Sequence, residues 1–183
     1  MTGPGTDATQ SLPRGIRLGV DVGDVRVGLA RSDLDGLIAT PVDTLTRDTA
    51  VMRVVEESRE CEARAIMVGL PRSLDGREGP AAVKARDFAA ELVAALATHG
   101  LEATVHLVDE RLTTVSAHRA MHASGRKGRK HRQVVDQVAA VMILQNALDL
   151  ERSTGARAGE QVLPSTPEDA QAIPHKEEDR DDA

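Results

Sequence analysis

The sequence predicts an α/β domain in which a mixed sheet begins with an antiparallel hairpin and carries helices on both faces. Short runs rich in valine, leucine and isoleucine alternate with longer amphipathic segments, as in parallel strands joined by helices. The turn signal Gly23–Asp24 separates the first two runs, which predicts the hairpin. The chain has 183 residues, of which 40% are hydrophobic, and this is enough to build one core.

The strands are predicted from apolar runs and the residues that bound them. Two runs flank the turn at Gly23–Asp24, and a third follows them. The fourth is apolar throughout and stops at Pro71, which indicates a buried parallel strand. The fifth ends in the acidic pair Asp109–Glu110. The expected strands cover residues 16–22, 26–32, 37–45, 65–70 and 104–110.

Four helices complete the expected order βββαβαβαα. The first is amphipathic, with Val51, Val54 and Val55 among charged residues. The second is rich in alanine and stops at Gly100, a helix terminator. The last is apolar on most sides of its middle, so we expect it to be buried there. The expected helices cover residues 47–62, 81–98, 113–123 and 133–150.

The ends of the chain differ in composition from its middle. We expect residues 1–14 to be disordered, residues 15–150 to form the folded domain, and residues 151–183 to form an acidic disordered tail. The tail carries −5 of the net charge of −6, so the domain is nearly neutral. The single Cys61 excludes a disulfide framework and a multi-cysteine zinc site, and indicates a reducing, cytoplasmic setting. No apolar run approaches a membrane span, so no membrane partner is expected.

A basic segment interrupts this nearly neutral domain between Arg119 and Arg132, where six bases occur without an acid. Such a segment indicates an anionic partner, and a solvated flexible loop is the alternative. The chain has one phenylalanine and no tryptophan or tyrosine, which argues against binding by base stacking on aromatic rings. The bases are Arg119, Arg126, Lys127, Arg129, Lys130 and Arg132.

Three carboxylates lie where the predicted fold can gather them. Asp21 lies near the end of the first strand, and Glu110 lies beside Asp109 at the end of the fifth, where open α/β sheets form their sites. Asp136 lies in the first turn of the last helix. Two carboxylates about 5 Å apart repel by about 3 kcal/mol at an effective dielectric constant of about 20, so such a cluster needs a cation. Oxygen ligands favour Mg²⁺ or Mn²⁺.

Each of these acids also has a structural alternative. Asp21 can form a turn, Asp109–Glu110 can be an exposed pair, and Asp136 can be a helix-start acid or a partner of Arg132. Strand alternation alone leaves open whether Asp21 and Glu110 face the same side of the sheet, and whether Asp109 or Glu110 is the ligand.

Four sequence blocks resemble the signatures of the YqgF/RuvX family, in order and with suitable spacing. The resemblance covers about residues 16 to 150 and implies an RNase H-like fold, precursor 16S rRNA nuclease activity, and kinship with Holliday junction resolvases. It also implies that Asp21, Glu110 and Asp136 are the metal-binding and catalytic acids. The blocks are GVDVGDVRVGLARSD (19–33), VGLPRSLDGREGP (68–80), VDERLTTVSA (108–117) and VDQVAAVMILQNALD (135–149).

The basic residues receive nucleic-acid-binding roles in this interpretation. Arg26 in the hairpin and Arg111 beside Glu110 are candidates to contact a scissile phosphate, although Arg26 can be an exposed strand residue and Arg111 can neutralise Asp109. The bases of the segment 126–132 are expected to follow the phosphate backbone with little base specificity. They are Arg126, Lys127, Arg129, Lys130 and Arg132.

The favoured function is that of a metal-dependent endonuclease that uses Mg²⁺ or Mn²⁺ and processes the 5′ end of precursor 16S rRNA during ribosome biogenesis. Expected partners are structured RNA, branched DNA and ribosomal particles, and the protein is expected to be a monomer or homodimer. Alternatives are a Holliday junction resolvase, which favours a homodimer, and a noncatalytic ribosome-assembly or nucleic-acid-binding module. An actin-like ATPase needs a second domain, for which about 135 folded residues leave no room.

Overall fold

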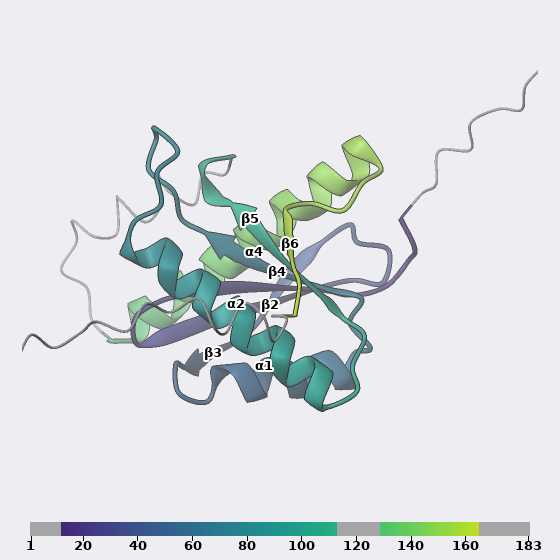
Figure 1. Ribbon diagram of the computed structural model, residues 1–183, viewed down its shortest axis with the longest axis horizontal. Coiled ribbons are helices and arrows are strands. Elements are labelled where there is room, and N and C mark those ends of the chain that lie inside the picture. Colours follow the sequence, from purple (N-terminus) through teal and green to yellow (C-terminus); the bar gives the residue numbers. More distant parts are fainter. Residues whose placement is uncertain (1–11, 113–128, 165–183) are drawn as a thin grey trace, which may run out of the picture.

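A computed structural model describes residues 12–112 and 129–164, with Leu112 and residues 129–136 described by their backbone alone. It confirms the mixed α/β class, and Figure 1 shows a single sheet between helices. The strands are β1 Arg17–Val22, β2 Arg26–Ser32, β3 Ala39–Thr46, β4 Ala65–Leu70, β5 Thr104–Asp109 and β6 Glu160–Val162. The helices are α1 Ala50–Glu60, α2 Pro80–Thr98 and α4 Arg129–Thr154, and a short 3₁₀ turn, η1, spans Glu110–Leu112.

The strand order is β3-β2-β1-β4-β5-β6. Strands β1 and β2 form the predicted antiparallel hairpin, and β3 pairs antiparallel with β2. Strands β1, β4 and β5 run parallel, which places their carboxyl ends at one edge of the sheet. The central strand β4 is buried at every position, as its uninterrupted apolar run predicts.

Two cores lie on opposite faces of the sheet. One core gathers under α1 and α2 and contains Val20, Phe88 and Leu92. The other lies under α4 and contains Met67, Val108 and Leu144. Figure 1 shows α1 and α2 side by side on one face and α4 on the other, which confirms the expectation of helices on both faces.

Two glycines let α4 approach the sheet closely. A methyl group on Gly19 of β1 would lie 2.5 Å from Cβ of Leu144 and 2.9 Å from the carbonyl oxygen of Ala140. A methyl group on Gly69 of β4 would lie 2.5 Å from Cδ1 of Ile143. Glycine inside a strand marks such a close approach, and here it fixes where the helix crosses β1 and β4.

The ordered chain extends past the expected boundary at residue 150. Helix α4 continues to Thr154, and β6 pairs antiparallel with β5, so the expectation of disorder is wrong for residues 151–164. Glu151 is 4% exposed and accepts hydrogen bonds from Arg17 (3.2 Å) and Arg157 (2.8 Å). This buried ion pair joins α4 to β1, which explains why the helix does not end where its apolar pattern fades.

Several expectations fall outside the described residues. They concern the helix expected at 113–123 and the disorder expected in residues 1–11 and 165–183. Within the described helices, none combines the length and the apolar run that crossing a bilayer requires.

Candidate metal and nucleic-acid site

Asp21 lies on the sheet face that α4 covers. It is the fifth residue of β1 and shares its face with Gly19, whose nearest neighbours belong to α4. Its Cα partner in the hairpin is Gly28, and its side chain is 6% exposed. A carboxylate this buried requires strong compensation.

Glu110 lies on the same face. It follows directly after β5, it is 2% exposed, and a methyl group on Gly69 would collide with its Oε1 atom. Gly69 belongs to β4, which lies between β1 and β5 in the sheet. Because Val20 pairs with Val68, Asp21 and Gly69 are the next residues along neighbouring strands. The structure therefore brings Asp21 and Glu110 toward the same point above β4, a coincidence of faces that the sequence left open.

The backbone of Asp136 lies on the path that leads to this point. Helix α4 runs antiparallel to β1, because Arg17 pairs with Glu151 whereas Gly19, further along the strand, meets Ala140. Asp136 is one helical turn before Ala140, so it continues this series toward the end of β1 where Asp21 lies.

The two neighbouring carboxyl groups of Asp109 and Glu110 have opposite electrostatic environments. Burial raises the pKa of Glu110 to about 7, with a smaller contribution from the negative charge of Asp109. Hydrogen bonds from Arg111 hold the pKa of Asp109 below its ordinary value. Asp109 is therefore ionised and paired with arginine, whereas burial disfavours the charged form of Glu110. A divalent cation would offset the cost of charging the buried Glu110 carboxyl, which favours Glu110 over Asp109 as a ligand.

The donor set fits a hard cation. Asp21 and Glu110 offer carboxylate oxygens, the ligands that Mg²⁺ and Mn²⁺ prefer. The side chains that the structure describes contain no group of three His, Cys, Asp or Glu that could hold a metal ion. The third predicted ligand, Asp136, is described by its backbone alone.

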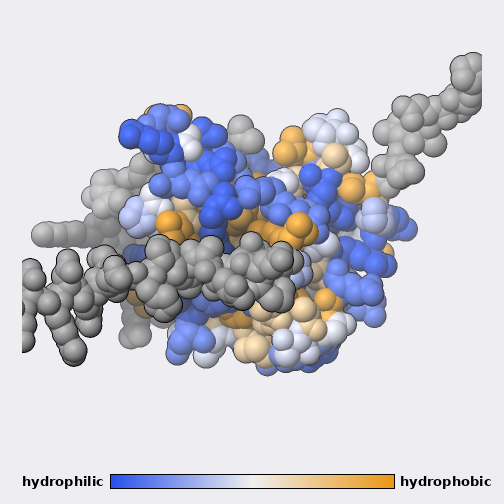
Figure 2. Space-filling view, viewed as in Figure 1, coloured by the Kyte–Doolittle hydropathy of each residue, from blue (hydrophilic) through white to orange (hydrophobic). Residues whose placement is uncertain are grey.

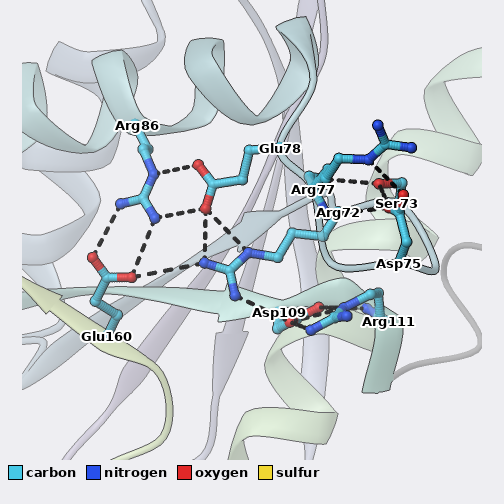
Figure 3. Close-up of polar contacts among 9 residues, drawn as sticks. All are labelled: Arg72, Ser73, Asp75, Arg77, Glu78, Arg86, Asp109, Arg111 and Glu160. Carbon is cyan, nitrogen blue, oxygen red and sulfur yellow. Dashed lines mark hydrogen bonds and ion pairs between the residues drawn. The ribbon is translucent and has the colours of Figure 1, made fainter.

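A chain of ion pairs extends from this site across the edge of the sheet (Figure 3). Asp109 accepts hydrogen bonds from Arg111 (2.7 Å) and Arg72 (3.4 Å). Arg72 also donates to Glu78 (2.7 Å), and Arg86 donates to both Glu78 (2.7 Å) and Glu160 (3.1 Å). Three arginines and three acids thereby connect η1, the 71–79 loop, α2 and β6.

The predicted nucleic-acid-binding residues have different surroundings. Arg111 is one-third exposed, and its guanidinium group binds Asp109. It therefore neutralises Asp109, which is the alternative role that the sequence offered for it. Arg26 begins β2 and shares its face with Gly28, the partner of Asp21, because Val27 between them points into the opposite core. Arg129, Lys130 and Arg132 lie in the first turns of α4, where only the backbone is described, and Arg126 and Lys127 lie outside the described residues.

Sequence reasoning missed two parts of the site. Arg72 was not selected, because its partners Glu78, Asp109 and Glu160 are distant in the sequence and no local pattern relates them. The role of Gly69 was also missed, although a glycine inside an otherwise apolar strand is the available signal for a close approach.

Comparisons with known proteins agree with this geometry. Residues 15–150 match the RuvX family, described as a Holliday junction resolvase. A protein from a Nocardioides species named "Putative pre-16S rRNA nuclease" is 53% identical over 154 residues, which cover 81% of this chain and 96% of the relative. A relative of the same name from Mycobacterium sp. (strain KMS) is 45% identical over 168 residues, which cover 85% of this chain and 97% of the relative.

Among solved structures, Thermus thermophilus RuvC bound to a Holliday junction is similar, with a TM-score of 0.51 and 13% identity. The similarity covers 78% of this chain and 98% of that chain. It confirms the RNase H-like class of the sheet and its helices.

Proposed function

This chain belongs to the RuvX family, and from that premise we propose that it is a metal-dependent endonuclease that processes the 5′ end of precursor 16S rRNA. The observation that carries the proposal is the convergence of buried Asp21 and Glu110 on one face, with the backbone of Asp136 directed toward them. Binding of nucleic acid alone would require basic side chains. A cluster of buried carboxylates instead serves phosphodiester hydrolysis with a bound metal. The names of the relatives supply the substrate.

The acids have the roles of ligands in this mechanism. Asp21, Glu110 and Asp136 would hold Mg²⁺ or Mn²⁺, which activates water and stabilises the leaving oxygen when bound. Burial of Asp21 and Glu110 limits competition from bulk water for these carboxylates. Glu110 would have to release its proton to hold a cation, because burial raises the pKa of its carboxyl to about 7.

The basic residues would hold the nucleic acid against the acids. Arg132 precedes Asp136 by four residues, which is about 6 Å along the axis of α4. The basic segment therefore ends close to the proposed ligands, where Arg129, Lys130 and Arg132 would contact phosphates, with Arg126 and Lys127 before them in the chain. Arg26, on the same face as Asp21, would contact the scissile phosphate.

Cleavage of a precursor 16S rRNA fragment that retains its 5′ leader tests the proposal. Wild type should cut it with Mg²⁺ or Mn²⁺ and fail in EDTA, and Asp21→Asn should abolish cutting while the far-ultraviolet circular dichroism spectrum stays unchanged. Full cutting by Asp21→Asn, or the absence of cutting by wild type with either metal, would contradict it. Binding to ribosomal particles without cleavage of the RNA would indicate a noncatalytic ribosome-assembly module.

Branched DNA is the second candidate substrate, because the matched family is described as a Holliday junction resolvase. Resolution requires two sites acting on symmetric strands and hence a homodimer. Cleavage of a synthetic four-way junction in the same assay would favour this function if sedimentation shows that the protein is a dimer.

We further propose a cytoplasmic location, where both precursor rRNA and reduced Cys61 are expected.

A further inference from the structure

We propose that Leu74 is a wedge that enters the base stack beside the scissile phosphate and opens a paired substrate for cleavage. The inference rests on the proposed nuclease function and assigns a specificity-determining role to the loop that joins β4 to α2. This 71–79 loop follows the last residue of β4 and projects from the domain at the upper left of Figure 1.

The exposure of Leu74 is unusual in this fold. Its side chain is 94% exposed, more than that of any other large apolar residue in the described parts of the chain. The sequence provides no aromatic alternative, because Phe88 is its only aromatic residue and is fully buried, with Arg47 4.8 Å from its ring centre. Leucine is one of the apolar residues that proteins insert between base steps.

The backbone around Leu74 is held in a defined turn. The Gly76 amide donates to the Ser73 carbonyl (2.8 Å), and the Ser73 amide donates to the Arg77 carbonyl (3.0 Å). Gly76 has a φ of 87°, which favours glycine. Arg72 and Glu78 form a β-bridge at the base of the loop. A turn held in this way fixes the backbone of its tip residue, which reduces the backbone entropy lost on insertion.

Ion pairs brace the base of the loop against the domain (Figure 3). Glu78 accepts hydrogen bonds from Arg72 on its own loop and from Arg86 of α2, and Arg86 also pairs with Glu160 of β6. Arg72 continues the network to Asp109 at the end of β5. Because these ion pairs fix the loop at both of its ends, the sheet supports the tip of the loop when the tip contacts a substrate.

The loop also lies next to the proposed metal ligands. A methyl group on Gly76 would lie 3.2 Å from Nη1 of Arg111, so the turn packs on the residue that follows Glu110. Leu74 is two residues from that contact. Arg77, three residues further along, is 87% exposed and pairs with Asp75, and Figure 2 shows a largely hydrophilic loop surface in the same view. An exposed apolar tip on a hydrophilic loop suits insertion between base steps.

The test compares one cleavage site in two settings: within the stem of a synthetic RNA hairpin and in an unpaired strand. Leu74→Ser should lower the cleavage rate of the stem at least tenfold and leave that of the unpaired strand within about twofold of wild type. Leu74→Met should restore stem cleavage, because it retains an apolar side chain. The matched control is Leu163→Ser, since Leu163 is 70% exposed and follows β6, whose last residue pairs with Val105 near the opposite edge of the sheet.

A binding measurement separates opening from chemistry. With 2-aminopurine beside the scissile phosphate, the Asp21→Asn protein should raise the fluorescence of the stem on binding, and the Asp21→Asn, Leu74→Ser protein should not. Equal ratios of stem to unpaired cleavage in wild type and Leu74→Ser, or an unchanged fluorescence rise in the double variant, would overturn the wedge. Failure of wild type to cut either substrate would instead overturn the proposed function.

Discussion

Glu110→Gln should stabilise the metal-free protein at alkaline pH and have little effect in acid. Burial raises the pKa of the Glu110 carboxyl from 4.5 to about 7 in the folded protein, whereas the unfolded chain keeps the ordinary value. The folded state therefore binds the proton more tightly than the unfolded state. The stabilisation that this proton gives is complete below pH 4.5 and is lost as the pH rises through 7.

The magnitude follows from the size of this pKa difference. Relative to strongly acidic pH, ionisation of this carboxyl lowers the free energy of unfolding by about 3 kcal/mol at pH 8, and by about 1 kcal/mol at pH 5, where it ionises chiefly in the unfolded chain. Glutamine has a similar shape and no charge, so it avoids both losses. The advantage of the variant over wild type should therefore grow by about 2 kcal/mol between pH 5 and pH 8.

Urea unfolding in EDTA at the two pH values measures this difference. Glu78→Gln is the matched control with the opposite sign, because hydrogen bonds from Arg86 and Arg72 lower the pKa of Glu78 to about 2. That contribution is present above pH 4.5 and is lost as the pH falls toward 2, so this variant should be less stable than wild type at both pH values. An advantage of Glu110→Gln that is the same at pH 5 and pH 8 would refute the argument from burial.

Three further substitutions test the packing around the site. Gly69→Ala should displace the Glu110 carboxylate. The rise in melting temperature that Mg²⁺ or Mn²⁺ gives wild type at pH 8 should therefore shrink or vanish in this variant, and an undiminished rise would contradict this geometry. Gly19→Ala meets the backbone oxygen of Ala140 and should lower the free energy of unfolding by about 1–3 kcal/mol, measured in urea, whereas no loss would mean that α4 can shift freely. Glu151→Ala strands two buried or partly buried arginines and should lower the free energy of unfolding by about 3 kcal/mol or more by the same measurement; a change below about 1 kcal/mol would show that the pair is dispensable.

Local patterns explain which features could be predicted from the sequence. The hairpin follows from a turn signal between two β-rich runs, and β4 follows from an apolar run that stops at Pro71. Asp21 and Glu110 could be selected as candidate site residues because the end of a strand can be recognised from the residues next to it. Their meeting on one face depends on the register of β1, β4 and β5 and on where α4 crosses them, and neither follows from the spacing of residues.

The missed features are nonlocal. Strand β6 has three residues, Glu160–Val162, and lies among acidic and small residues, so composition indicated a tail where pairing with β5 imposes order. The ion pairs of Arg72 reach 6, 37 and 88 residues along the chain, to Glu78, Asp109 and Glu160, and no periodicity relates such positions. Contacts of this kind exist only once the sheet has formed.

Strand β6 has a practical consequence for dissecting this protein. The family match ends at residue 150, but Glu151 anchors α4 to β1, and Glu160 carries the brace on which the 71–79 loop depends. A truncation designed from the family match would keep every proposed ligand and still remove both supports. Loss of activity in such a truncation would result from a loosened scaffold and not from a missing catalytic group. The smallest fragment suited to functional work should therefore retain the chain through Pro164.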